Sequence, residues 1–323
     1  MQSNPASTRP GLAILFWFYD HLEVCVDRVR LLRELNPDCK IYGLFGGLHE
    51  NAARFSGSLT PYLDHFYTFP LDWPPLEKWR NGDLMIAQWF RDAGTELEWD
   101  TLIVAQWDML ILEPVEKLFR ELKKDELYVS SVQPIERIER RWFWTAPWNP
   151  PARRTYEEFL SHIRGLTPEP PEILACLFVV VCLPRLFLQR YTVIDRPELG
   201  FLEYRLPTYA RLFGTPLANL DFAAALPELP ETFRGKRRFL VPIPPAIPLL
   251  EIYLERCRPH GAAVFHPYTR PFYRDLRGIL RRGLRDIGRD LPRSVVFHRM
   301  EVTSWLAARA AGREVPHEKS ITR

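Results

Sequence analysis

The chain has 323 residues, of which 46% are hydrophobic and 26% are charged, and its formal net charge is +3. This composition is typical of a soluble globular protein, and no apolar run approaches the ~20 residues that a membrane-spanning helix requires. The polar N-terminus lacks the apolar core of a signal peptide, and the five cysteines show no metal-finger spacing. We therefore expect a cytoplasmic protein with buried, reduced thiols.

Positive charge is concentrated in the last part of the chain. Residues 270–323 contain 13 Lys and Arg against 6 Asp and Glu, whereas the remainder contains 30 against 34. No basic stripe with interleaved aromatic residues recurs elsewhere, which argues against a nucleic-acid partner. The sequence predicts one domain over residues 1–269, followed by a basic helical extension over residues 270–323.

The first third of the chain alternates between strand and helix patterns. Continuous apolar runs predict strands covered on both faces, and apolar residues at helical spacing predict the helices between them. The predicted strands are Leu12–Tyr19, Lys40–Phe45, Tyr62–Phe69 and Thr101–Ala105, and the predicted helices are Glu23–Leu35 and Asp83–Ala93. This order is typical of βαβ units, so the expected fold class is α/β, with a mostly parallel sheet flanked by helices.

The pattern becomes less regular after residue 112. Helices and strands still alternate, but they are separated by a loop at residues 140–154 that is rich in Trp, Pro and Arg. The predicted helices are Pro114–Leu122, Thr155–Arg164, Pro184–Tyr191 and Leu249–Cys257, and the predicted strands are Tyr128–Val132 and Ile173–Cys182.

A carboxylate interrupts the apolar stretch TLIVAQWDMLIL at residues 101–112. An ionised carboxylate is costly to bury without a partner. Asp108 follows the fourth predicted strand, and ligands of open α/β sheets bind beyond the carboxyl ends of the strands. The position of Asp108 therefore predicts a ligand site, although capping of the next turn is an alternative.

Taken together, these segments resemble the GT-A class of nucleotide-sugar glycosyltransferases. The resemblance covers residues 11–270. Its motifs are the first strand, the strand ending in QWD where those enzymes carry a DXD motif, the acidic-headed segment 199–214, and a late His in VFHPYT. Gln106 replaces the first Asp of DXD. The resemblance implies a GT-A (Rossmann-like) fold that moves a sugar from a nucleotide-diphosphate sugar to an acceptor hydroxyl, with metal assistance and inversion.

The resemblance also implies a divalent cation, Mn²⁺ or Mg²⁺, that neutralises the leaving diphosphate. Asp108 would be its principal ligand, and His266 would be a second ligand. Gln106 would contact the ribose or a metal-bound water. A structural role in the core is the alternative for His266.

Inverting transfer needs a general base for the acceptor hydroxyl. Glu203 is the predicted base, because the positive end of a helix dipole would stabilise its charge. Arg205 would orient a phosphate or that carboxylate. Glu198 is a rival base and Asp195 a third candidate, and no nucleophile is evident if transfer proceeds with retention. The alternative for Glu203 is that it only favours the start of the helix.

The nucleotide and the acceptor are expected to contact two further sets of residues. The residues expected to contact the nucleotide are Tyr19, Asp20, Gly46, Gly47, Asp83, Gln106, Trp107 and Arg205. Among them, Asp83 would contact the ribose or donor sugar. Turn or cap chemistry is the alternative role for this set. The loop tryptophans Trp142, Trp144 and Trp148 would form an acceptor lid for a glycan or lipid-linked acceptor, unless they only pack the loop onto the body.

The sequence leaves two questions open: whether the domain is catalytic, and what segment 275–289 contacts. A degenerate GT-A domain would bind a nucleotide sugar or a partner without turnover, and Gln106 is the warning sign for it. Segment 275–289 has an arginine-rich face and an apolar face, so it either packs on its own domain or contacts the inner face of an anionic membrane.

Overall fold

The computed structural model describes residues 10–218, 239–240, 249–257 and 262–272, together with four single positions between 283 and 288. The chain divides into two compact units, one of residues 1–222 with 269–271 and one of residues 223–268 with 272–323. Most of the predicted extension, including most of segment 275–289, lies outside the described residues, so the boundary after residue 269 stays a prediction. Within the described residues, no helix has both the length and the apolar character to cross a bilayer.

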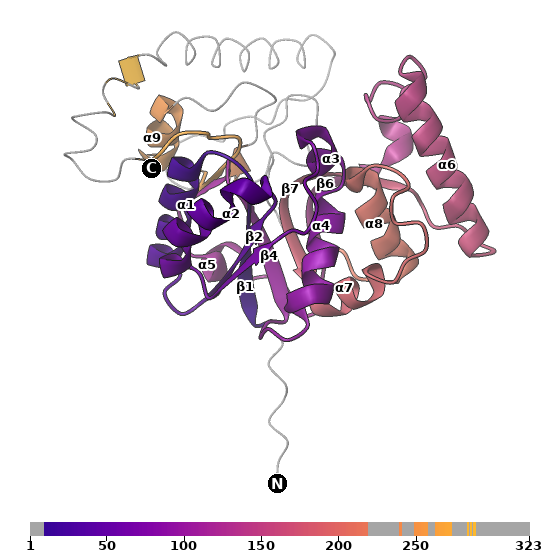
Figure 1. The fold of residues 1–323 in the computed structure, drawn as a ribbon. Helices are drawn as coiled ribbons and strands as arrows, with labels where there is room; N and C mark the ends of the chain where they lie inside the picture. Colours follow the sequence, from indigo (N-terminus) through magenta and orange to yellow (C-terminus); the bar gives the residue numbers. More distant parts are fainter. Residues whose placement is uncertain are drawn as a thin grey trace, which may run out of the picture. The chain divides into compact units, whose positions relative to one another are not determined.

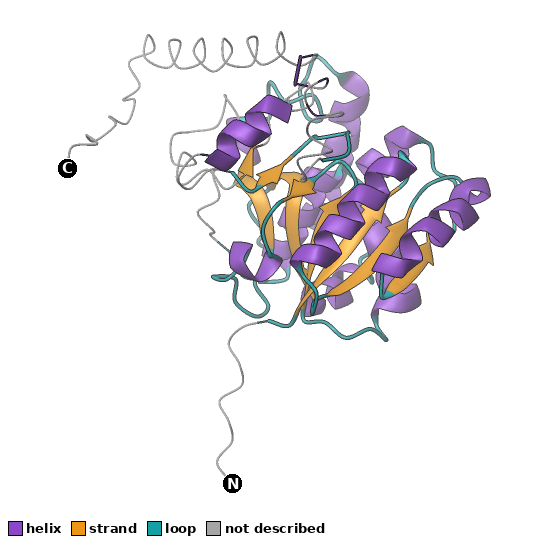
Figure 2. Cartoon of the chain, turned by 90° about the vertical axis from the view of Figure 1, so that its left-hand side faces the viewer, coloured by secondary structure: helices purple, strands orange, loops and turns teal. Residues whose placement is uncertain are grey.

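A six-stranded sheet forms the centre of the first unit (Figures 1 and 2). Its strand order is β3-β2-β1-β4-β7-β6. The pairs from β3 to β4 are parallel, and β7 runs antiparallel to both β4 and β6. The strands are β1 (Leu12–Phe18), β2 (Lys40–Phe45), β3 (His65–Thr68), β4 (Thr101–Gln106), β6 (Tyr128–Pro134) and β7 (Leu174–Pro184). This arrangement confirms the predicted α/β class with a mostly parallel sheet.

Helices cover both faces of this sheet. In Figure 1, α1 and α2 lie on one face, and α4, α7 and α8 lie on the other. The helices of the unit are α1 (Leu22–Leu35), α2 (His49–Leu59), α3 (Pro75–Arg80), α4 (Gly82–Trp89), α5 (Val115–Leu118), α6 (Pro150–Leu166), α7 (Arg185–Tyr191) and α8 (Leu202–Leu212). Short 3₁₀ turns occupy Thr60–Tyr62 and Ile135–Arg137, and a π-helical turn, Phe90–Gly94, continues α4.

Several predicted boundaries differ from the structure. The third strand is shorter than predicted, because a 3₁₀ turn occupies its expected start. Helix α6 begins five residues earlier than predicted, at two prolines that the first helical turn accommodates. The helix predicted over Pro114–Leu122 is a single turn, α5. The short strand β5 (Leu110–Ile111) precedes it.

The described part of the second unit is small. Its helix α9 (Leu249–Cys257) matches the prediction. The two-residue strands β8 (Phe239–Leu240) and β9 (Val264–Phe265) pair in parallel.

The carboxyl ends of β1, β2 and β4 lie side by side in the sheet. Trp17 of β1 pairs with Gln106 of β4, and Phe18 pairs with Phe45 of β2. Residues 19–20, 46–47 and 107–108 therefore leave the sheet at one edge, which is where ligands bind in folds of this class.

Candidate active site

Three aromatic rings meet where β1 and β4 end. Tyr19 contacts Trp107 edge-on, with ring centroids 5.8 Å apart, and His21 stacks on Trp107 with centroids 4.7 Å apart and an interplanar angle of 23°. The backbone N–H of Trp107 donates to the Trp17 carbonyl at 3.0 Å, so strand pairing continues to the start of this cluster. We call Tyr19–His21 together with Trp107–Asp108 the donor corner.

Two carboxylates of the donor corner act on the Tyr19 ring. Burial is the main cause that raises the pKa of Tyr19, and the negative charges of Asp108 and Asp20 raise it further. Tyr19 is therefore a neutral phenol at physiological pH. Asp20 is exposed and Asp108 is partly exposed. Both predicted carboxylates thus lie within electrostatic reach of one ring.

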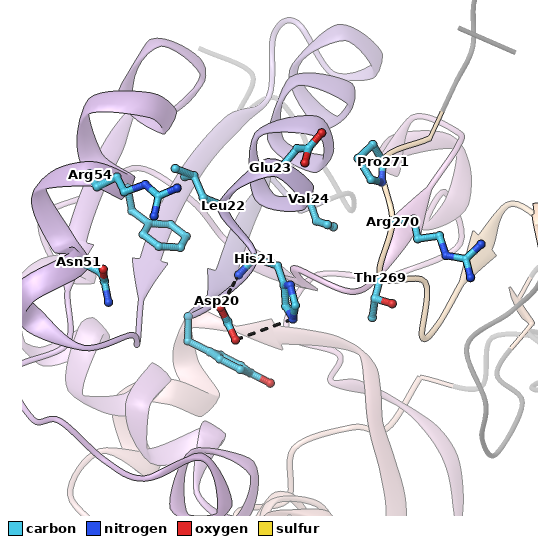
Figure 3. Close-up of a pocket in the computed structure, with 12 residues that line it drawn as sticks. Asp20, His21, Leu22, Glu23, Val24, Asn51, Arg54, Thr269, Arg270 and Pro271 are labelled. Atoms are coloured by element: carbon cyan, nitrogen blue, oxygen red, sulfur yellow. Dashed lines mark hydrogen bonds and ion pairs between the residues drawn. The ribbon is translucent and has the colours of Figure 1, made fainter. Parts of the chain in front are cut away.

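A pocket of about 500 Å³ adjoins the donor corner and shares Tyr19, Asp20 and His21 with it (Figure 3). Residues of α1, α2 and the segment 269–271 complete its lining. Asn51 and Arg54 from α2 line it, and their side chains make no hydrogen bond or ion pair within the described part of the chain. These two polar groups are available to a ligand, and sequence reasoning did not identify them.

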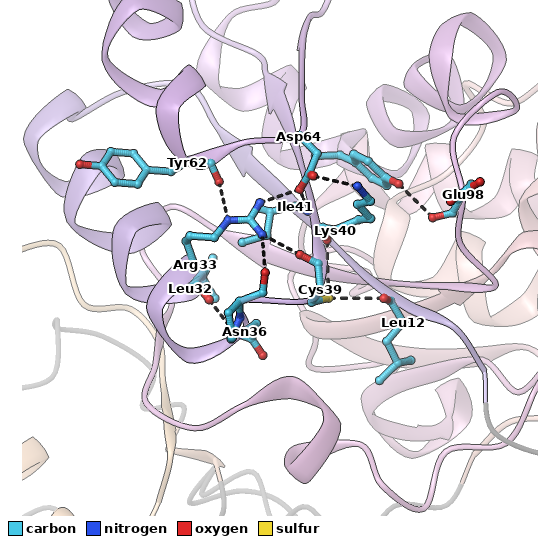
Figure 4. Close-up of polar contacts among 12 residues, drawn as sticks. Leu12, Leu32, Arg33, Asn36, Cys39, Lys40, Ile41, Tyr62, Asp64 and Glu98 are labelled. Atoms are coloured by element: carbon cyan, nitrogen blue, oxygen red, sulfur yellow. Dashed lines mark hydrogen bonds and ion pairs between the residues drawn. The ribbon is translucent and has the colours of Figure 1, made fainter.

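A separate cluster of polar side chains lies at the amino end of β2, and its members bond to one another and to the backbone (Figure 4). Arg33 of α1 donates to the backbone carbonyls of Cys39 and Tyr62 and to the Asp64 carboxylate. Asp64 also accepts from Lys40 and from the Ile41 N–H. Partial burial opposes ionisation of Asp64, but these bonds lower its pKa. This cluster joins α1 to β2 and β3 and is structural.

Glu203 lies in the first turn of α8, as predicted. It is partly exposed, and its Oε1 accepts a 2.8 Å hydrogen bond from the Phe178 N–H. The side chain of Gln106 donates to the carbonyl of the same residue, Phe178, at 2.7 Å. One residue of β7 therefore links the predicted base to the end of β4.

The pKa of Glu203 is strongly perturbed. Burial raises it to about 7 from an ordinary value of 4.5, although the Phe178 N–H acts in the opposite direction. A carboxyl group with this pKa exchanges its proton near neutral pH, as a general base requires. The rival Glu198 is instead exposed and pairs with Arg196 at 3.4 Å.

Asp83 and Arg205 form a buried ion pair. The Arg205 guanidinium contacts both carboxylate oxygens of Asp83, at 2.5 and 2.9 Å, and both side chains are fully buried. Tyr191 donates a further bond to Asp83. Because these groups satisfy each other, we assign them to the packing of α4 on α8 and do not include them in the ligand site.

The two glycines after β2, Gly46 and Gly47, lie against the backbone at the end of β1. Gly46 N–H donates to the Phe18 carbonyl at 2.8 Å. A Cβ on Gly47 would lie 2.7 Å from the Tyr19 carbonyl oxygen and 2.3 Å from the Phe45 ring. Only glycine permits this close approach, so Gly47 helps to set the position of Tyr19.

The three loop tryptophans have different environments. Trp144 is buried and stacks on Phe201 at 4.0 Å, and Trp142 is partly buried against Phe201 and Tyr204. Trp148 is 62% exposed.

Two exposed aromatic residues that the sequence analysis did not identify extend this cluster. Phe143 lies between Trp144 and Trp148, with centroids 5.0 and 5.9 Å away, and Trp79 of α3 contacts Trp144 at 5.0 Å. Trp79 and Phe143 are 55% and 51% exposed. We call Trp79, Phe143 and Trp148 the aromatic patch.

The donor corner contains two carboxylates, those of Asp20 and Asp108. Carboxylate ligands fit Mg²⁺ or Mn²⁺. These ions commonly bind one or two protein carboxylates, and phosphate oxygens and water fill their remaining coordination positions. Among the described residues, no group of three or more His, Cys, Asp and Glu side chains forms a metal cage. His266 belongs to the second unit, so its pairing with Asp108 stays a prediction.

Neither a protein-family model nor a curated protein sequence matches the chain. Among solved structures, the chain is similar to the mannosyltransferase PcManGT from Pyrobaculum calidifontis in complex with GDP-Man and Mn²⁺. That match has a TM-score of 0.38 and 10% identity, and covers 66% of this chain and 55% of that one.

The chain is also similar to the galactosyltransferase LgtC in complex with donor and acceptor sugar analogues. The TM-score is 0.41, with 14% identity over 81% of this chain and 90% of that one. A third match is the bifunctional glycosyltransferase WbbM, with a TM-score of 0.42 and 10% identity over 82% of this chain and 46% of that one. The chain spans about half the length of PcManGT and of WbbM. These similarities concern the fold.

Proposed function

We propose that the protein is a GT-A glycosyltransferase that moves a sugar from a nucleoside-diphosphate sugar to an acceptor hydroxyl. The observation that carries this proposal is Glu203, a carboxylate with a pKa of about 7 that is linked through Phe178 to the end of β4. Beside that strand end lie the aromatic rings and carboxylates of the donor corner. A base next to a site suited to a nucleotide and an anion is the arrangement that glycosyl transfer needs.

In the proposed reaction, the acceptor oxygen attacks the anomeric carbon while the bond from that carbon to the diphosphate oxygen breaks. The diphosphate leaves with the bonding electrons, and Glu203 takes the proton of the acceptor hydroxyl. Attack from the face opposite the leaving group inverts the anomeric centre. The Phe178 N–H holds the Glu203 carboxylate in place for this step.

A divalent cation, Mn²⁺ or Mg²⁺, is part of the proposal. Asp108 and Asp20 would hold it, with His266 as the further predicted ligand, and it would stabilise negative charge on the departing diphosphate. Around it, the chain supplies the rings of Tyr19 and Trp107 for stacking and the pocket beside them for the nucleotide.

The acceptor is proposed to bind at the aromatic patch. Exposed aromatic faces suit the apolar faces of sugar rings. Phe201, on which Trp144 stacks, is two residues before Glu203, and Trp79 contacts Phe201 as well. The patch is therefore continuous with the helix start that carries the proposed base. Trp142 and Trp144 would hold the loop in place, and Trp148 would contact the glycan or lipid-linked acceptor.

The test is an assay for release of nucleoside diphosphate from a panel of UDP-, GDP-, ADP- and CDP-sugars, with Mn²⁺ present. We expect one donor to be turned over by the wild type and by Glu198→Gln. Glu203→Gln should bind the same donor without turnover, and Asp108→Asn should lose donor binding. Full activity of Glu203→Gln would refute the assignment of the base.

A degenerate domain that binds a nucleotide sugar without turnover is the second candidate. It is favoured by Gln106, which stands in place of an anionic ligand and uses its amide nitrogen on the Phe178 carbonyl. The same assay separates the two candidates, because the degenerate domain would bind a donor and release no diphosphate even with excess acceptor.

A further inference from the structure

Most of Lys78 in α3 is buried. It is only 5% exposed, and its ammonium lies 5.7 Å from the centroid of the Tyr19 ring. Within the described part of the chain, this ammonium makes no hydrogen bond or ion pair. Burial lowers the pKa of Lys78, and the charges of Asp72 and Asp20 oppose that effect from beyond ion-pair distance.

Other deeply buried cations of the unit have carboxylate partners. Arg205 pairs with Asp83, and Arg28 pairs with Asp27. An ammonium without a carboxylate partner can bind an anionic ligand. Lys78 is therefore the exception that requires an explanation.

The surroundings of Lys78 indicate which ligand that is. Its ammonium lies over the face of Tyr19, a donor-corner residue, and cation–π attraction favours this position. The next residue, Trp79, contacts Trp144 and Phe201 on the acceptor side. Helix α3 thus places a positive charge between the proposed donor and acceptor sites, where the diphosphate would lie.

We propose that Lys78 binds the diphosphate of the donor as a point charge, separately from any cation held by Asp108. This proposal rests on the proposed function, since it specifies one contact of the same site. A lysine ammonium is an established type of phosphate ligand in proteins. During transfer, Lys78 would remain protonated and would stabilise the charge that develops on the leaving phosphate.

Lys78→Met is the informative variant, because methionine keeps an unbranched apolar side chain and removes the charge. Without ligand, we expect its melting temperature to stay close to that of the wild type, since within the described residues Lys78 makes no ion pair that the substitution would break. Lys117→Met is the matched control, because Lys117 is 62% exposed and pairs with Glu113 on the surface. Lys78→Arg keeps the positive charge.

The experiment is isothermal titration of these proteins with UDP, GDP, ADP and CDP, with the four nucleosides, and with inorganic pyrophosphate, each with and without Mn²⁺. Lys78→Met should weaken binding of the preferred nucleoside diphosphate at least about tenfold, as expected for loss of a bond to a charged group. Nucleoside binding should be unchanged, Lys78→Arg should recover most of the affinity, and Lys117→Met should match the wild type.

Equal affinity of Lys78→Met and the wild type for that diphosphate would overturn the inference and leave the proposed function standing. Loss of pyrophosphate binding alone, with nucleoside diphosphate affinity unchanged, would also overturn it, because the anion site would then lie apart from the donor. If no nucleoside diphosphate binds the wild type under either condition, the proposed function itself is wrong.

Discussion

Glu203→Gln is the substitution that examines the perturbed carboxyl group most closely. In the wild type, Oε1 of Glu203 accepts the Phe178 N–H at 2.8 Å. A glutamine carbonyl at the same place can accept this bond, so the variant removes the charge and keeps the contact. Any change in how stability depends on pH then reports on ionisation of this one group.

The direction of the effect follows from the pKa. The unfolded chain releases the Glu203 proton near 4.5, whereas the folded protein keeps it until about pH 7. Between these values the folded state binds more protons, so its free energy of unfolding falls as pH rises. At about 1.4 kcal/mol per pKa unit, the loss is at most about 3.5 kcal/mol, and partial exposure of Glu203 makes this an upper limit.

Urea denaturation at a series of pH values between 4 and about 8 measures this difference. We expect Glu203→Gln to match the wild type at the acid end and to become more stable than it through neutral pH. Glu198→Gln is the control, since Glu198 is exposed, and its curve should follow the wild type throughout. Parallel curves for wild type and Glu203→Gln would refute the reasoning, because the carboxyl group would then ionise normally.

Three further substitutions test other parts of the structure. Asp83→Ala should lower the free energy of unfolding by about 3–5 kcal/mol in chemical denaturation, because it leaves Arg205 buried without its carboxylate. Gly47→Ala should destabilise by about 1–3 kcal/mol, since its methyl would lie 2.7 Å from a backbone oxygen, whereas Gly57→Ala, with open space at the Cβ, should not lower the melting temperature. Trp148→Ala should raise the KM for the acceptor and leave the melting temperature unchanged, because the ring is 62% exposed; an unchanged KM would contradict the proposed acceptor contact.

Much of the sheet was predictable because its strands are buried on both faces. β1 is a continuous apolar run, and the structure buries nearly all of it, so the run alone indicated a central strand. Helix α2 was not predicted, because it buries only Phe55 and Leu59 and its sequence is otherwise polar and small. A helix with so narrow an apolar face gives little periodic signal.

The candidate site was predictable where a polar residue ends an apolar element. Asp108 stands in such a position, two residues beyond the end of β4. Glu203 was predicted instead from its place at the start of a helix, and the structure has it in the first turn of α8. The pairing of Asp83 with Arg205 was not predictable, since 122 residues separate them and only the folded chain brings them together. The burial of Lys78 was not predictable from the sequence either, because a lysine in a short helix normally points to solvent.

A crystal structure of the protein with its preferred nucleoside-diphosphate sugar tests the central claim most directly. The account predicts that the diphosphate lies in the donor corner, beside Asp108 and within contact of the Lys78 ammonium, with the anomeric carbon turned toward Glu203. A nucleotide bound away from Asp108 and Lys78, at any other edge of the sheet, would contradict it.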